Sequence, residues 1–135
     1  MSAADIDQAV RRLLFVAANP SIDRLYEVDR LVMGTIHRPQ SIVAVKLGAE
    51  GALACRADGL IVRVRAMPVE AMDTTGAGDS FNAGFLRAWL GGRDLRESLE
   101  LGAVCGALST RRSGGVDGQA TLAEAREALA SWVGG

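Results

Sequence analysis

The sequence predicts an α/β fold with a small, mostly parallel sheet, one β-hairpin and at least three helices. Two observations predict it. Short apolar runs that stop at turn residues fill the first half of the chain, and apolar residues recur at helical spacing from residue 79 onward. The length of 135 residues suits one domain, and a hydrophobic fraction of 49% is enough to build its core.

Several segments of the first half are expected to form strands. Residues 13–18 and 42–45 are continuous apolar runs, too short for helices, and such runs usually lie in a sheet that is covered on both faces. Residues 24–38 alternate loosely between apolar and charged side chains, which indicates one or two weaker, more exposed strands. Residues 52–65 predict a hairpin around Asp58-Gly59, whose alternating second strand indicates an edge position.

The second half is expected to be helical. The first helix is indicated by aromatic residues that recur every four positions and by a glycine pair that ends it: Phe81, Phe85, Trp89 and Gly91-Gly92. Capping boxes, in which a short polar residue precedes a glutamate by three positions, open two more helices: Asp94 with Glu97, and Thr121 with Glu124.

Charge and cysteine content exclude several classes of function. The 15 basic and 16 acidic residues nearly cancel, so no bulk field favours nucleic acid or an anionic membrane. Cys55 and Cys105 form no CxxC pair, which argues against a zinc cluster, and two reduced thiols are expected. No segment predicts a transmembrane helix or a signal peptide, so the cytoplasm is the expected compartment.

One stretch carries chemistry: a glycine-rich loop that runs from Asp73 directly into a helix. Gly76 and Gly78 permit close approach, and the N–H groups of residues 76–79 would point together at the helix start, where the helix dipole favours an anion. Asp79 at this place fits a helix cap, and it equally fits an acid that accepts a hydroxyl proton during phosphoryl transfer. The residues alone leave both interpretations open.

Two other phosphate-binding motifs are excluded. A Walker A loop needs a lysine after its last glycine, whereas Asp79 follows Gly78 and Lys46 is the only lysine in the chain. A GxGxxG dinucleotide motif fails because Phe81 stands at the position of its last glycine.

The stretch from Asp73 to Leu86 resembles the C-terminal signature of the ribokinase-like, PfkB family of carbohydrate kinases. Residues 46–52 resemble the strand-turn-strand that contacts ATP in this family. Residues 19–39 resemble the opening of its phosphosugar-kinase branch, which contains 1-phosphofructokinase and tagatose-6-phosphate kinase. The resemblance implies a shortened form of the family's three-layer fold. It also implies phosphoryl transfer from ATP, with Mg²⁺, to a hydroxyl group of a sugar or sugar phosphate.

The resemblance further implies roles for individual residues. Asp79 is expected to be the catalytic base, beside an anion hole formed by Gly76, Ala77 and Gly78. The nucleotide is expected to contact Gly78 and a set of earlier residues: Lys46, Gly48, Ala49, Glu50 and Gly51. Asn19 and Asp23 are expected to bind the sugar. Asp73 and Thr75 match positions that bind a monovalent cation such as K⁺ in some members.

Residues 1–135 are expected to form one shortened domain. Residues 13–39 correspond to the N-terminal strand and the start of a lid over the sugar, and residues 42–135 to the nucleotide-binding part. The family's N-terminal glycine-rich signature and its NxxE segment have no counterpart between Pro39 and Ile42. Three hypotheses follow: an active kinase, a catalytically impaired remnant that binds nucleotide, and an interaction fragment. A homodimer would be one way to cover the apolar faces that lost their neighbours.

Overall fold

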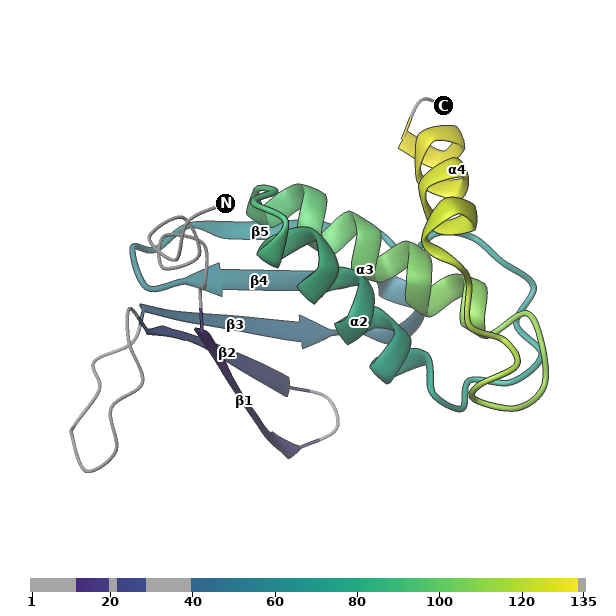
Figure 1. Cartoon of the computed structure of the whole chain (residues 1–135), viewed down its shortest axis with the longest axis horizontal. Helices are drawn as coiled ribbons and strands as arrows, with labels where there is room; N and C mark the ends of the chain where they lie inside the picture. Colours follow the sequence, from purple (N-terminus) through teal and green to yellow (C-terminus); the bar gives the residue numbers. More distant parts are fainter. Residues whose placement is uncertain (1–11, 20–21, 29–39, 134–135) are drawn as a thin grey trace, which may run out of the picture.

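The computed structural model describes residues 12–19, 22–28 and 40–133, with the side chains of residues 42–132. One five-stranded sheet follows the chain order (Figure 1). Its strands are β1 (Arg12–Asn19), β2 (Ile22–Val28), β3 (Gln40–Lys46), β4 (Ala52–Arg56) and β5 (Ile61–Val64). Strands are therefore present at residues 13–18, 24–28, 42–45 and in the predicted hairpin, which is β4–β5. The rest of the strand and lid segment expected at residues 24–39 lies outside the described residues.

The prediction of a mostly parallel sheet is wrong, because all four neighbouring pairs of described strands are antiparallel. Parallel neighbours need a crossover of a dozen or more residues, usually a helix. Here residues 20–21 join β1 to β2, and the short turns 47–51 and 57–60 join the strands from β3 to β5. The continuous apolar runs suggested strands covered on both faces, as in a parallel sheet. The direction of a strand is decided by the connection to its neighbour, and these connections are short.

Three helices follow the sheet: α2 (Ala77–Leu90), α3 (Leu95–Ser109) and α4 (Leu122–Val133). Figure 1 shows α2 and α3 side by side over strands β3 to β5, and α4 packs against α3. The main core joins the helix-facing positions of the sheet with α2 and α3 and contains Ile42, Ala44, Ala52, Ala54, Val62, Val64, Phe81, Phe85, Trp89, Leu95, Leu99 and Ala103. The described residues thus form two layers, and the third layer of the expected fold is not among them.

The predicted helix signals are confirmed. The Asp94 carboxylate accepts from the Glu97 N–H at 2.8 Å, and the Glu97 carboxylate accepts from the Asp94 N–H at 3.1 Å. Thr121 and Glu124 form the same reciprocal pair at the start of α4. The aromatic residues of α2 stack in succession, with centroids 6.4 Å apart for Phe81–Phe85 and again for Phe85–Trp89. These contacts fix α2, whose first turn carries the candidate site.

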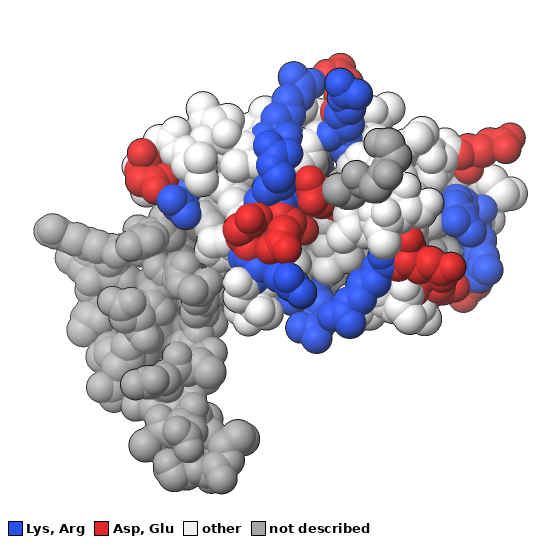
Figure 2. Space-filling view, turned by 90° about the horizontal axis from the view of Figure 1, so that it is seen from above, with Lys and Arg blue, Asp and Glu red and all other residues white. Residues whose placement is uncertain are grey.

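Acidic and basic side chains are interspersed on the face shown in Figure 2. Two pairs within α3 and its entry illustrate this: Arg93 lies 3.2 Å from Glu97, and Arg96 lies 3.8 Å from Glu100. Exposed pairs of this kind contribute at most about 1 kcal/mol each. Among the described helices, none has the length and apolar character needed to cross a membrane.

Candidate functional site

The loop that begins at Asp73 enters α2 through a left-handed residue. Gly76 caps the helix with φ 75° and ψ 0°, a conformation that glycine adopts without the steric cost of a side chain. The Ala77 N–H donates to the Thr74 carbonyl at 3.2 Å, and the Ser80 N–H donates to the Gly76 carbonyl at 2.9 Å. The first turn of α2 therefore starts abruptly at the loop, with the positive end of its dipole facing outward.

Asp73 ties this loop to the chain that follows α3. Its carboxylate accepts from the Thr75 N–H at 2.9 Å and from the Gly114 N–H at 3.0 Å. These bonds, the one from Gly114 first, lower the pKa of Asp73 to about 2. A Cβ atom on Gly76 would lie only 3.1 Å from the Cα atom of Gly115. Two loops that are about forty residues apart in the sequence are thus held together at the helix start.

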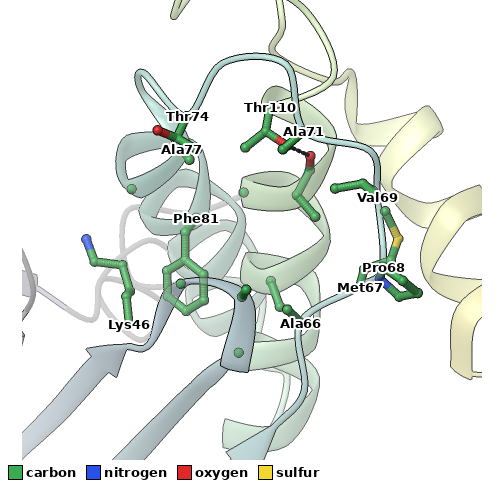
Figure 3. Close-up of a pocket in the computed structure, with 17 residues that line it drawn as sticks. Lys46, Ala66, Met67, Pro68, Val69, Ala71, Thr74, Ala77, Phe81 and Thr110 are labelled. Atoms are coloured by element: carbon green, nitrogen blue, oxygen red, sulfur yellow. Dashed lines mark hydrogen bonds between the residues drawn. The ribbon is translucent and has the colours of Figure 1, made fainter.

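A cavity of about 550 Å³ opens beside the first turn of α2 (Figure 3). Its described walls come from the β3–β4 turn, the segment after β5, the start of α2 and one side of α3. They contain Lys46, Gly48, Ala49, Gly51, Ala66, Met67, Pro68, Val69, Ala71, Thr74, Ala77, Gly78, Phe81, Ala103, Gly106, Ala107 and Thr110. This volume is in the range of cavities that bind small molecules and cofactors.

One end of the cavity is polar. The Lys46 ammonium group donates to the Asn82 side-chain oxygen at 3.4 Å. A Cβ atom on Gly78 would lie 3.2 Å from the Lys46 Nζ atom, so the ammonium group sits beside the first turn of the helix. Thr74 and Ala77 lie above Lys46 in Figure 3. A cation next to a helix N-terminus is an arrangement suited to a phosphate group.

The other end is apolar. Met67, Pro68 and Val69 stand on the side away from Lys46 in Figure 3, and Phe81 lies between. Small residues of α3 form the facing wall: Ala103, Gly106 and Ala107. Neither wall was predicted from the sequence. A stripe of small residues at helical spacing in α3 was the available signal for one, whereas residues 66–71 show no periodicity and gave none.

The structure brings five of the six predicted nucleotide residues into the lining of one cavity: Lys46, Gly48, Ala49, Gly51 and Gly78. Ala77 of the predicted anion hole lines the same cavity. Glu50 does not line it and pairs with Arg63 at 3.5 Å on the surface. The remaining loop residues lie beside the cavity rather than in its described lining: Asp73, Thr75, Gly76 and Asp79. Asp79 is exposed in the first turn of α2 and directly follows Gly78.

The two predicted sugar-binding residues lie on described strands, but their side chains lie outside the described part. Asp23 pairs with Ala44, and Ile22, the partner of Asn19, pairs with Val45. The register therefore places Asn19 and Asp23 toward the end of the sheet at which Lys46 lies.

The described residues include no group of three His, Cys, Asp or Glu side chains that could hold a metal ion. Mg²⁺ commonly binds through one or two carboxylates, substrate phosphates and water rather than in an all-protein cage. The carboxylates that directly adjoin the polar-end lining in the sequence are Asp73 and Asp79, which belong to the loop and the first turn of α2.

Comparison with known proteins agrees with this geometry. Residues 14–122 match the family model described as pfkB family carbohydrate kinase. An uncharacterised sugar kinase of Archaeoglobus fulgidus is 43% identical over 107 residues, which cover 78% of this chain and 42% of that protein.

Two solved structures resemble the fold. The ribokinase of Arabidopsis thaliana, solved with ribose and ATP, has a TM-score of 0.62 and 28% identity over 64% of this chain and 28% of its own. An Escherichia coli protein described as a ribokinase II, solved with ATP and Mg²⁺, has a TM-score of 0.58 and 31% identity over 62% of this chain and 27% of its own. The chain thus spans less than half the length of each of these proteins.

Proposed function

The chain belongs to the pfkB family of carbohydrate kinases, and from this premise we propose that it transfers the terminal phosphoryl group of ATP to a hydroxyl group of a sugar or sugar phosphate. The observation that carries the proposal is that one end of the cavity is polar and the other end is apolar. A nucleoside triphosphate has an apolar, planar end and a highly charged end. The cavity has an apolar slot at residues 66–71 and a lysine beside a helix N-terminus at its other end.

The two ends of the cavity define how the nucleotide lies in this proposal. Its base enters the slot between Pro68 and α3, and its phosphates reach Lys46 and Gly78. The turn of residues 48–51 borders the nucleotide, with Gly48, Ala49 and Gly51 in the lining and Glu50 at its outer side. Backbone N–H groups at a helix start and an ammonium group stabilise phosphate oxygens without any carboxylate nearby in the lining.

Asp79 acts as the base in this proposal. Its carboxylate accepts the proton of the sugar hydroxyl, whose oxygen forms a bond to the γ-phosphorus while the bond to the β–γ bridging oxygen breaks and ADP leaves. The N–H groups of Gly76, Ala77 and Gly78 stabilise the charge on the phosphoryl oxygens. The Ala77 N–H donates to Thr74 in the structure, so its part requires that 3.2 Å bond to be given up.

Two cations belong to the proposal. Bound together with the nucleotide, Mg²⁺ would supply positive charge to the phosphate groups that we place beside Lys46 and Gly78. A monovalent cation such as K⁺ is proposed beside Asp73 and Thr75. The Asp73 carboxylate supports it, because its two oxygens offer about four lone pairs, of which the N–H groups of Thr75 and Gly114 use two.

Asn19 and Asp23 are proposed to bind the sugar from the end of the sheet next to Lys46. A substrate that already carries a phosphate, as in the 1-phosphofructokinase and tagatose-6-phosphate kinase branch, is the finer proposal. The cytoplasm, where ATP and sugar phosphates meet, is the proposed compartment.

A second candidate function is nucleotide binding without turnover. The observation that favours it is that the chain spans only 42% of the Archaeoglobus relative, while five of the six predicted nucleotide residues line one cavity. Mispositioning a hydroxyl by about 1 Å costs on the order of 100-fold in rate, so catalysis demands more of the chain than binding does.

The Asp79→Asn variant tests the proposal. We expect it to slow ADP formation by about 100-fold or more with the best of fructose 1-phosphate, fructose 6-phosphate and ribose. Nucleotide binding, measured by calorimetry, should stay unchanged, because Asp79 does not line the cavity. Asp117→Asn, at another exposed position, is the matched control.

Equal turnover in Asp79→Asn and the unmodified chain would contradict the role of Asp79. Binding of ATP by the unmodified chain without any phosphorylated product would favour the second candidate. Absence of nucleotide binding would contradict both.

A further inference from the structure

The side chains that line the cavity offer few hydrogen bonds to a base. Among the described lining residues, only Lys46, Thr74 and Thr110 carry a nitrogen or oxygen in the side chain. Lys46 and Thr74 lie at the polar end, beside the start of α2. Thr110 is therefore the described side chain within reach of the apolar end that could read a base.

The polar groups of Thr110 are already largely engaged in hydrogen bonds within the protein. Its hydroxyl group donates to the Ala107 carbonyl at 2.7 Å, the bond drawn in Figure 3. Its backbone carbonyl accepts from the N–H groups of Met72 and Asp73, at 2.7 and 3.1 Å. The hydroxyl oxygen can still accept a hydrogen bond. Adenine offers a donor at its amino group and guanine offers donors at N1 and N2, so such an acceptor does not separate the two.

Backbone groups supply the remaining donors and acceptors. Within the described part of the chain, the backbone of residues 66–71 makes no hydrogen bond to protein. This segment borders the cavity through five residues, whose backbone C=O groups, and N–H groups except at Pro68, are available to a ligand. Adenine presents an amino donor where guanine and hypoxanthine present a carbonyl acceptor. A small shift of the base along the segment would match either pattern.

The shape of the slot is held by packing. Met67 packs against the second core cluster, which contains Ala88, Leu101, Val104, Leu108 and Ala125. On the facing wall, a Cβ atom on Gly106 would lie 3.2 Å from the Ala77 carbonyl oxygen, so α3 lies close to α2 there. The side chains of the slot thus form an apolar space between Met67 and α3 and supply few directed polar groups.

We propose that this cavity selects a purine base by its shape but does not distinguish one purine from another. GTP and ITP should therefore bind nearly as well as ATP. This inference rests on the proposed nucleotide-binding function. A site built to hydrogen-bond a substrate rejects an analogue by about 10⁴-fold or more, whereas an apolar pocket discriminates weakly. One exchanged hydrogen bond changes the affinity by roughly tenfold at most.

Competition binding to the full chain tests the inference without requiring turnover. A fluorescent ATP analogue is bound in the presence of Mg²⁺ and displaced by ATP, GTP, ITP or UTP. We expect the dissociation constants of the three purine nucleotides to agree within about tenfold. UTP should bind several-fold more weakly, because a single ring buries less apolar area in the slot.

Binding of ATP together with at least about 100-fold weaker binding of both GTP and ITP would overturn the inference and leave the proposed function standing. Failure of every nucleotide to bind would overturn the proposed function and the inference with it. The two failures are therefore distinguishable in one titration.

Two variants test which residues determine purine binding and which determine the preference between purines. Ala107→Leu fills the slot and should weaken the binding of all three purine nucleotides alike by about tenfold or more, whereas Ala123→Leu, exposed on α4, should not. Thr110→Val should leave the ratio of ATP to GTP affinity unchanged, and this ratio does not depend on the fraction of folded protein. A change of more than about tenfold in that ratio would show that Thr110 reads the base and would overturn the inference.

Discussion

Lys46 and Gly78 form the most specific contact of the site at the scale of residues. Gly78 has an ordinary helical conformation, so its backbone does not require glycine; a Cβ atom there would lie 3.2 Å from the Lys46 ammonium nitrogen. The missing side chain makes room for the cation. The polar end of the cavity thus depends on a lysine and a glycine from different elements.

Gly78→Ala should therefore weaken ATP binding roughly three- to tenfold by displacing the Lys46 ammonium group. It should change adenosine binding little, because adenosine has no phosphates. A double-mutant cycle with Lys46→Ala, followed by calorimetry, measures the coupling. An equal effect of Gly78→Ala in the Lys46→Ala background would contradict this explanation. Loss of helix stability would not explain the result, since alanine is the better helix former.

Asp73 makes stability depend on pH. Hydrogen bonds from the Gly114 N–H and then from Thr75 lower its pKa from 3.8 to about 2. A carboxyl group whose pKa is lower in the folded than in the unfolded state stabilises the fold above its unfolded pKa. That contribution is lost as the pH falls through the folded pKa. We expect it to be complete at neutral pH and to disappear between about pH 4 and pH 2.

Urea unfolding of Asp73→Asn should therefore differ from the unmodified chain most at neutral pH and least near pH 2. Asp58→Asn is a matched control. The pKa of Asp58 is also lowered to about 2, mainly by the hydrogen bond from the Arg56 side chain in the hairpin turn. Both variants should share the pH dependence, but only Asp73→Asn should weaken nucleotide binding. Equal weakening by Asp58→Asn would contradict a local role of the Asp73 bonds.

At the scale of elements, the close pair of α2 and α3 positions the site. A Cβ atom on Gly84 would lie 2.7 Å from the Cys105 sulfur and 2.8 Å from the Leu101 carbonyl oxygen. The backbone oxygen cannot turn away as a side chain can. The two helices therefore approach each other at a glycine, and this approach sets the distance between the first turn of α2 and the α3 wall of the cavity.

Gly84→Ala should lower the free energy of unfolding by about 1–3 kcal/mol, measured by urea denaturation, because it forces the helices apart. Ala83→Ser, on the neighbouring exposed position, should change it by less than about 0.5 kcal/mol. An unchanged or increased stability of Gly84→Ala would show that helix propensity outweighs the close contact.

Local signals in the sequence predicted the elements well. The two capping boxes and the aromatic repeat of α2 are formed by residues within four positions of each other, and all three are present in the structure. Strand direction was not predicted correctly, because it depends on connections between strands and not on the apolar runs at residues 13–18 and 42–45. Part of the site was predicted from the loop at residues 73–79. The wall at residues 66–71 was not, since its role depends on tertiary contact alone.

At the scale of the whole molecule, helices cover one face of the sheet, and no helix among the described residues covers the other face. Core side chains alternate with a second set that points to that other face: Val43, Val45, Leu53, Cys55 and Ile61. These residues are half-buried except Ile61, which is 66% exposed. An apolar face of this kind favours association with a second apolar surface.

We expect concentration-dependent self-association through this face, measured by sedimentation velocity. Ile61→Lys should shift the chain toward monomer by placing a charge in the contact. Leu90→Lys, at an exposed position at the end of α2, is the control and should leave association unchanged. A monomer at every concentration, or an equal effect of the two substitutions, would contradict the expectation.

The described cavity walls have one further property: they all come from the uninterrupted stretch of residues 46–110. Contacts that are close in sequence form with a small loss of chain entropy, and a nascent chain folds what has already emerged from the ribosome. The segments that line the described pocket have therefore all been synthesised before α4 emerges, and the packing of Met67 against a cluster that includes Ala125 of α4 completes the slot afterwards. If the proposed function is right, nucleotide bound at that stage would stabilise this part of the protein by mass action.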